Sequence, residues 1–202
     1  MPKTIRSGRV TRKTAETDIT LAINLDGSGA ARIALEVGFF GHMLEQLARH
    51  ALIDIDLTAK GDVHIDSHHV VEDCGRAFGS ALKQALGDSR GISRYGMALL
   101  PMDESLSRVV VDICGRGHLV WRMPPLAERI GDCASEVIPE FFQGVAQTAG
   151  ITLHIENLYG SNSHHIIESC FKGFARALRQ AVTVDGRAAT SIPSTKGVIT
   201  GE

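Results

Sequence analysis

Two adjacent histidines followed by a glutamate three residues later occur twice in this 202-residue chain. The copies are His68-His69-Val70-Val71-Glu72 and His164-His165-Ile166-Ile167-Glu168, and each runs into a similar helical segment. Nine of the 19 aligned positions agree between residues 68–86 and 164–182, including both histidines and the glutamate. An agreement of this length predicts an internal duplication, so we expect the chain to fold as two similar halves.

Hydrophobic periodicity predicts the same order of elements in both halves. For the first half it indicates strands at 17–25 and 30–37 joined by a hairpin turn at 26–29, a helix at 39–50, a strand at 52–58 and a helix ending at Leu86. For the second half it indicates strands at 106–113 and 118–123, a helix at 136–148, a strand at 151–157 and a helix ending near Val182. This order predicts an α+β fold in which helices pack on one face of a small sheet in each half. We expect one domain, residues 1–202, made of repeats at about 9–92 and 93–186 with a functional tail at 187–202.

Composition excludes several classes of protein. A hydrophobic content of 44% and a charged content of 22% are typical of globular chains. The net charge of -2 and the lack of a basic stripe argue against nucleic-acid binding. No apolar run reaches the length of a membrane span, and no signal-peptide pattern follows Met1. The four cysteines lack CxxC spacing, so we expect buried thiols in a reducing cytoplasm.

The histidine motif has the geometry of a metal site when it is placed on a helix. Successive helical residues are rotated by about 100°, so His69 diverges from His68 while Glu72 lies between them at about 40°, one turn further on. Imidazole and carboxylate donors without a thiolate favour Mn²⁺, Fe²⁺, Co²⁺ or Zn²⁺ over Ca²⁺. Because the paired rings diverge, we expect the two histidines of each motif to reach two different ions, in sites built from both repeats within one chain or across a subunit boundary.

Further charged residues extend the candidate site. His42 precedes the first motif and Glu140 the second, each beside a Phe-Phe pair, so they are candidate additional ligands. The alternative is an ordinary helix-start histidine and a first-turn carboxylate that the helix dipole favours. Arginine, lysine and hydroxyl side chains in loops that contain glycine are candidates to hold a phosphate group. The alternative for each residue taken alone is an ordinary charged or polar side chain in a solvated loop. The candidates are Arg94, Arg116, Ser194, Thr195 and Lys196.

Over nearly its full length the chain resembles the imidazoleglycerol-phosphate dehydratases of histidine biosynthesis. The matching strings are the two motifs, extended to His68-His69-Val70-Val71-Glu72-Asp73 and Asn162-Ser163-His164-His165-Ile166-Ile167-Glu168, together with the segments 9–17, 42–47, 102–104, 176–181 and Pro193-Ser194-Thr195-Lys196-Gly197. The resemblance implies a fold like domain 2 of ribosomal protein S5, duplicated. It also implies trimers that assemble into a hollow 24-subunit particle with active sites between subunits.

The resemblance implies two Mn²⁺ ions per active site and a set of ligands in this chain: His42, His68, His69, Glu72, His164, His165 and Glu168. Many members carry histidine at the position of Glu140, which we keep as a further expected ligand because Mn²⁺ accepts oxygen donors. The residues implied to contact substrate are Glu16, Gln46, His50, Arg94, Arg116, Ser194, Thr195 and Lys196. Of the acidic and imidazole groups, those implied in catalysis are Glu16, His42, His68, Glu72, His164 and Glu168.

The implied reaction dehydrates D-erythro-imidazole-glycerol phosphate to imidazole-acetol phosphate. The proton that leaves is next to no carbonyl, so the imidazole ring has to accept the electrons, through an imidazolate and a diazafulvene-type intermediate. We expect Glu16 to act as general acid and base. Two other functions fit the same donors: a dinuclear metallohydrolase that activates water, or a non-enzymatic metal-binding shell.

Overall fold

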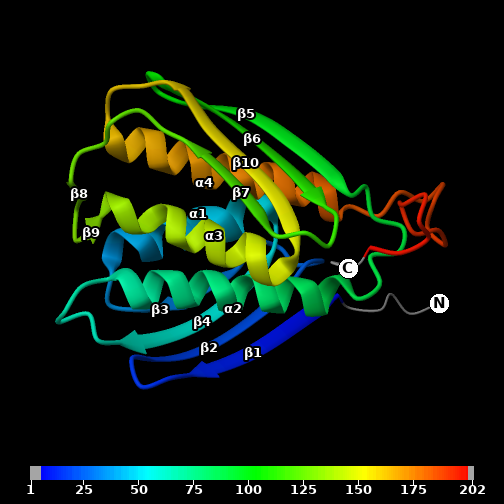
Figure 1. The fold of residues 1–202 in the computed structure, drawn as a ribbon, viewed down its shortest axis with the longest axis horizontal. Helices are drawn as coiled ribbons and strands as arrows, with labels where there is room; N and C mark the ends of the chain where they lie inside the picture. Colours follow the sequence, from blue (N-terminus) through cyan, green and yellow to red (C-terminus); the bar gives the residue numbers. More distant parts are fainter. Residues whose placement is uncertain (1–5, 200–202) are drawn as a thin grey trace.

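The computed structural model describes residues 6–199 as two four-stranded sheets with four helices between them (Figure 1). The first half contains β1 (Ser7–Lys13), β2 (Thr17–Asn24), β3 (Ala31–Ala34), α1 (Gly38–Ala51), β4 (Asp54–Gly61) and α2 (His68–Leu86). The second contains β5 (Tyr95–Met102), β6 (Ser105–Ile113), β7 (His118–Arg122), the short strands β8 (Arg129–Ile130) and β9 (Cys133–Ala134), the 3₁₀ turn η1 (Ser135–Val137), α3 (Ile138–Ala149), β10 (Ile151–Tyr159) and α4 (Ser163–Val182). The duplicated α+β fold predicted from the sequence is thus confirmed.

Each sheet buries one face against helices of its own half. In β2 the buried side chains Ile19, Leu21 and Ile23 alternate with outward-facing polar residues or alanine, which is the period of a half-buried strand. Helix α2 packs on β1 and β2, and α4 packs on β5 and β6. The two halves join where α1 contacts α4 and α2 contacts α3 (Figure 1). Phe40, Phe141 and other large apolar side chains fill this interface without measurable exposure.

The pairing of β3 differs from the hairpin predicted from the sequence, and β7 pairs in the same way in the second half. The strand orders are β1-β2-β4-β3 and β5-β6-β10-β7, and β3 and β7 each run parallel to the last strand of their half. Residues 26–29 therefore form no hairpin, because β3, α1 and β4 make a parallel crossover unit. The Asp54 carboxylate at the start of β4 accepts hydrogen bonds from the backbone amides of Ser28, Gly29 and Ala30, and this fixes the loop.

Strands β1 and β5, which the periodicity did not predict, each lie at one edge of their sheet, and β3 and β7 lie at the opposite edges. The inward-facing positions of β1 and β5 include glycines where a helix comes very close. A Cβ atom on Gly8 would lie 2.0 Å from the carbonyl oxygen of Ala81 in α2, and one on Gly96 would lie 1.9 Å from that of Ala177 in α4. Because glycine has no side chain, a glycine at a buried strand position interrupts the alternation of apolar and polar residues by which a strand is predicted.

Two other expectations have clear outcomes. All four cysteines are free and buried, as predicted. Burial raises the pKa of the Cys170 thiol to about 12, which fits an unreactive packing residue. Within residues 6–199, none of the helices has the length and apolar character required to cross a bilayer.

Candidate functional site

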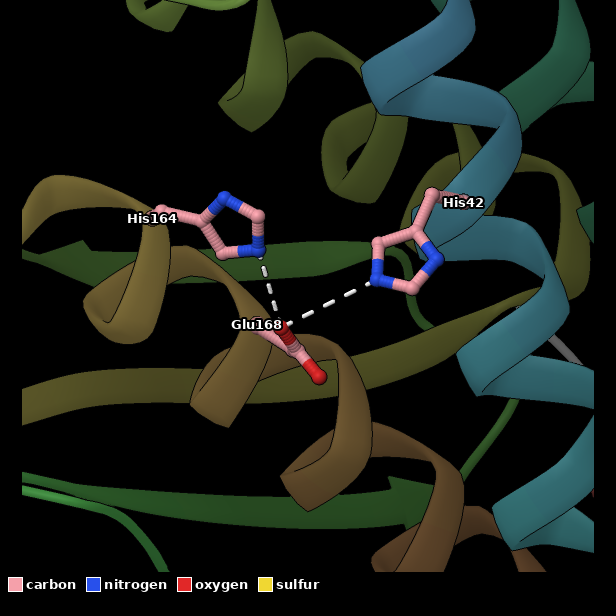
Figure 2. Close-up of side chains that lie close together, drawn as sticks. All are labelled: His42, His164 and Glu168. Carbon is pink, nitrogen blue, oxygen red and sulfur yellow. Dashed lines mark hydrogen bonds and ion pairs between the residues drawn. The ribbon is translucent and has the colours of Figure 1, made fainter.

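The second histidine motif meets His42 of the first half at the start of α4 (Figure 2). Nε2 of His164 lies 3.0 Å from Oε2 of Glu168, and Nε2 of His42 lies 3.9 Å from the same oxygen. The i,i+4 spacing of His164 and Glu168 brings them to one face of α4, and the contact between α1 and α4 adds His42. The Asn162 side chain caps α4 by accepting hydrogen bonds from the amides of His164 and His165, so the first turn that carries the motif is fixed.

Glu168 is the buried acid of this group, with 7% of its side chain exposed. Burial alone raises its pKa, but Lys172, one turn further along α4, donates a 2.6 Å hydrogen bond to Oε1 and His164 donates to Oε2. With the charge of His42 nearby, these contacts outweigh desolvation and hold the pKa of Glu168 below its usual value. The carboxylate is therefore ionised and ready to act as a ligand.

The donors of this group fit a divalent cation. One nitrogen or oxygen from each of His42, His164 and Glu168 lies within 4.8 Å of the other two. Bonds of about 2.1 Å to a common ion allow donor atoms to lie up to about 4.2 Å apart. The distances of 3.0 and 3.9 Å from Oε2 of Glu168 to the two histidine nitrogens are within that limit. In the part of the chain that the structure describes, this is the single group of three such residues.

The first motif is arranged differently. Helix α2 begins at His68, so the histidines are in its first turn, and the ring centroids of His68 and His69 are 6.0 Å apart. Among the described residues, Glu72 has no hydrogen bond or ion pair with His68; instead Arg76 on the next turn donates hydrogen bonds of 2.7 and 3.1 Å to its Oε1. His69 faces Asp62 through Nδ1 at 3.0 Å and Glu16 through Nε2 at 3.8 Å.

The paired histidines diverge in both motifs, as the angular argument predicts. The ring centroids are 6.0 Å apart for His68 and His69 and 6.2 Å apart for His164 and His165, and the latter two rings contact different carboxylates. His165 points away from Glu168 toward Glu104, whose Oε2 lies 2.7 Å from its Nδ1. Glu140 is half-buried in the first turn of α3 and belongs to no group of three donors within residues 6–199. One chain therefore brings together three of the eight expected ligands.

The expected phosphate residues near the tail do converge. A hollow of about 510 Å³ is lined by Arg94, which immediately precedes β5, by the 114–116 loop and by the tail. The expected phosphate residues among them are Arg94, Arg116, Ser194, Thr195 and Lys196. Arg94 is fixed in place because Nε and Nη2 bind the carboxylate of Asp112 and Nη1 donates to the carbonyl oxygen of Pro193. We call this hollow the tail pocket. The positive charges of its arginine and lysine side chains, and the tail backbone that Arg94 holds at Pro193, make it suited to bind an anion.

Gln46 and His50 lie elsewhere. They form a 3.2 Å hydrogen bond along α1, and His50 lines a separate hollow with Arg176 and Arg179 of α4. Burial, together with the charges of Lys172 and Arg176, lowers the pKa of His50. The tail pocket is at the end of the molecule where α4 ends, and the histidine motifs are at the opposite end, where α2 and α4 begin (Figure 1). A single chain therefore does not bring the motif residues and the tail pocket together.

Periodicity and motif spacing missed several residues that contact the motifs, namely Asp62, Arg76, Glu104 and Lys172. Lys172 was detectable, because a cation four residues after Glu168 repeats the relation of Arg76 to Glu72. Asp62 follows the end of β4, and nothing in its local sequence pattern indicates that it faces His69.

A model of the imidazoleglycerol-phosphate dehydratase family matches residues 36–178. The imidazoleglycerol-phosphate dehydratase of Methylobacterium radiotolerans is 56% identical over 193 residues, which are 96% of this chain and 99% of that protein. That of Nitrobacter hamburgensis is 56% identical over 197 residues, which are 98% and 100% of the two chains.

Two solved structures have the same fold. The imidazoleglycerol-phosphate dehydratase of Staphylococcus aureus superposes with a TM-score of 0.79 at 35% identity, covering 89% of this chain and 99% of that one. The Pyrococcus furiosus enzyme, in complex with (S)-C348, gives 0.80 at 33% identity and covers 94% and 99%. From the matched sequence, the duplicated fold and the histidine motifs, the chain belongs to the imidazoleglycerol-phosphate dehydratase family, which consists of hydro-lyases of histidine biosynthesis.

Proposed function

We propose that the protein catalyses the Mn²⁺-dependent dehydration of D-erythro-imidazole-glycerol phosphate to imidazole-acetol phosphate. The observation that carries this proposal is the convergence of His42, His164 and Glu168 from both halves on one small volume. Two imidazole nitrogens and an ionised carboxylate suit a borderline or hard divalent ion such as Mn²⁺. Membership of a hydro-lyase family decides against the metallohydrolase and the metal-binding shell.

Two Mn²⁺ ions per active site would draw their ligands from the eight residues named by resemblance: His42, His68, His69, Glu72, Glu140, His164, His165 and Glu168. When bound, such ions supply Lewis acidity toward the nitrogens of the substrate imidazole. Glu16 lies 3.8 Å from His69 and half of its side chain is exposed, which suits a group that takes a proton from one atom of the substrate and returns it to another. The tail pocket holds the phosphate group and thereby fixes the imidazole end of the substrate at the histidine motifs.

This arrangement requires more than one chain. The tail that lines the tail pocket lies at the end of the molecule where α4 ends, and the motifs lie at the opposite end, where α2 and α4 begin, whereas the substrate is small (Figure 1). We propose that a tail pocket of one chain faces the motifs of another, in trimers that assemble into a 24-subunit particle.

Removal of the metal tests the function directly. We expect the purified protein to lose nearly all activity on imidazole-glycerol phosphate after treatment with a chelator and to regain it with added Mn²⁺. The product, measured as the ketone, distinguishes dehydration from hydrolysis. Unchanged activity in metal-free protein, with the metal content verified by elemental analysis, would contradict the proposal.

Arg116 and Arg94 are expected to behave differently when replaced. Among the described residues no ion pair or hydrogen bond holds the Arg116 side chain, so Arg116→Ala should raise KM about tenfold or more with little change in Tm. Arg94→Ala also leaves Asp112 unpaired and frees the tail at Pro193, so it should lower Tm as well. Steady-state kinetics and thermal unfolding of both variants check this difference. Equal Tm losses in the two variants would count against it.

A further inference from the structure

The second histidine of each motif has its Nδ1 atom held by a carboxylate. Nδ1 of His69 lies 3.0 and 3.2 Å from the two oxygens of Asp62, and Nδ1 of His165 lies 2.7 Å from Oε2 of Glu104. The opposite nitrogen, Nε2, has only looser contacts: Glu16 at 3.8 Å from His69 and Asp103 at 3.7 Å from His165. The two rings are thus oriented in the same way, although their carboxylates come from different places in the fold.

Glu104 is itself fixed by the backbone. Its Oε1 accepts hydrogen bonds from the amides of Ser161 and Asn162, the residues immediately before α4. Its other oxygen is then aimed at His165, and the hydrogen bond from His165 is the main reason that the pKa of Glu104 falls to about 2. Asp62 is held through its backbone instead, because its amide donates a hydrogen bond to the carbonyl oxygen of Glu16, and only 15% of its side chain is exposed.

The duplication explains why the two carboxylates are not equivalent. Thr17 begins β2 and bonds Asp73 of α2, and Ser105 begins β6 and lies 3.5 Å from Ser169 of α4, so these pairs correspond. Glu16 immediately precedes Thr17, and Glu104 immediately precedes Ser105. Glu104 is therefore the repeat counterpart of Glu16. In the first half Asp62 occupies Nδ1 and Glu16 is left facing Nε2, whereas in the second half Glu104 has taken the Nδ1 side.

We propose that Asp62 and Glu104 are positioning residues, which hold Nδ1 of His69 and His165 so that Nε2 of each ring is the free donor to a metal ion. A ring nitrogen that donates to a carboxylate leaves the other nitrogen with its lone pair, and a fixed ring orientation makes that nitrogen a better ligand. The inference rests on the proposed function, in that His69 and His165 are taken as ligands. It adds that Glu16 and Glu104, although repeat-related, have separate tasks.

A purely structural role for Glu104 is the competing explanation, since it also ties down residues 161 and 162. The variant Glu104→Gln separates the two. A glutamine has one acceptor oxygen and one amide nitrogen, so if the oxygen keeps the two backbone amides, its NH₂ group faces Nδ1 of His165. That contact favours the tautomer with the proton on Nε2, which is the wrong one for a ligand.

Nitrogen-15 NMR of the metal-free protein measures the tautomers without any need for metal binding. At an alkaline pH where both rings are neutral, we expect His69 and His165 to carry the proton on Nδ1. Glu104→Gln should shift His165 toward the Nε2-protonated form and leave His69 unchanged, and Asp62→Asn should do the converse. Wild-type rings protonated on Nε2 would overturn the proposal whether or not the protein binds Mn²⁺.

Mn²⁺ titration followed by electron paramagnetic resonance measures the consequence. We expect Glu104→Gln and Asp62→Asn each to weaken binding at the affected site about 10- to 100-fold. Glu156→Gln is the matched control, because Glu156 is a surface carboxylate of the same half, paired with Arg108, and its loss should change the affinity less than about twofold.

A double-mutant cycle distinguishes positioning from loop structure. In a His165→Ala background, Glu104→Gln should have almost no further effect on Mn²⁺ affinity if it acts through His165. An undiminished effect would assign Glu104 to the loop and overturn its positioning role. If the wild type binds no Mn²⁺, the proposed function fails at its metal step, and the NMR result still decides between the two readings of Asp62 and Glu104.

Discussion

Two variants that are each inactive should restore activity when they are co-expressed and assemble together. His164→Ala removes one of the three donors His42, His164 and Glu168. The double substitution Arg116→Ala with Lys196→Ala removes two positively charged side chains from the tail pocket. Each is expected to lower kcat/KM by about 100-fold or more, because each removes fixed charge or ligands from the reacting region. In mixed particles about a quarter of the sites should receive an intact motif from one chain and an intact pocket from another.

The expected recovery follows from the distance between the two ends of the chain. If motif and tail pocket of one chain formed one active site, every site in a mixed particle would contain a defect and the mixture would stay inactive. A co-expressed pair of His42→Ala and His164→Ala is the matched control, because both defects lie in the same group and cannot complement across that interface. Turnover per particle, with the ratio of the two chains measured by mass spectrometry, gives the result. Equal activity in the test and control mixtures would contradict a shared site.

The sequence predicted the elements better than it predicted their neighbours. Apolar periodicity located the helices and the strands with alternating burial, because burial of one face leaves its mark on consecutive residues. It did not reveal that β3 and β7 pair with the last strand of each half, since that pairing depends on the crossover through a helix and, in the first half, on the contact between Asp54 and the 28–30 amides. Strands β1 and β5 lack a clear alternation: Gly8 and Gly96 stand at inward positions, and in β5 the outward-facing Met97 and Leu99 are also apolar.

For the candidate site, too, the sequence predicted local features and did not predict contacts between distant parts of the chain. The divergence of the paired histidines follows from helical angles alone, and the structure shows it in both motifs. The partner of the second motif, His42, comes from the other half of the chain, so the contact between α1 and α4 had to be known first. Asp62 and Glu104 lie at the ends of strands, where sequence patterns say little about the direction of a side chain. The separation of the tail pocket from the motifs is likewise a property of the assembled fold.

Gly96→Ala should destabilise the protein strongly, although alanine is a better residue than glycine in most ordered positions. Alanine at a compatible site stabilises by about 0.4–1 kcal/mol, because it restricts the unfolded chain. At position 96, however, its Cβ would lie 1.9 Å from the carbonyl oxygen of Ala177 and 2.8 Å from the carbonyl carbon. These are backbone atoms of α4, so relief requires the whole helix to move away from β5. Overpacking of this kind costs about 3 kcal/mol, which outweighs the entropic gain.

The repeat supplies a second test at the equivalent contact. Gly8→Ala brings a Cβ within 2.0 Å of the carbonyl oxygen of Ala81 in α2 and should destabilise to a similar extent, whereas Gly186→Ala, with nothing within 4 Å, should have no such effect. The urea midpoint of each variant measures this. Because α4 carries His164 and Glu168 near its start, displacement of the helix by Gly96→Ala should also weaken Mn²⁺ binding in the fraction that remains folded. If the urea midpoint of Gly96→Ala equalled that of Gly186→Ala, α4 would be able to move away from β5 at little cost in stability. The close packing of α4 on Gly96 would then not determine where His164 and Glu168 lie.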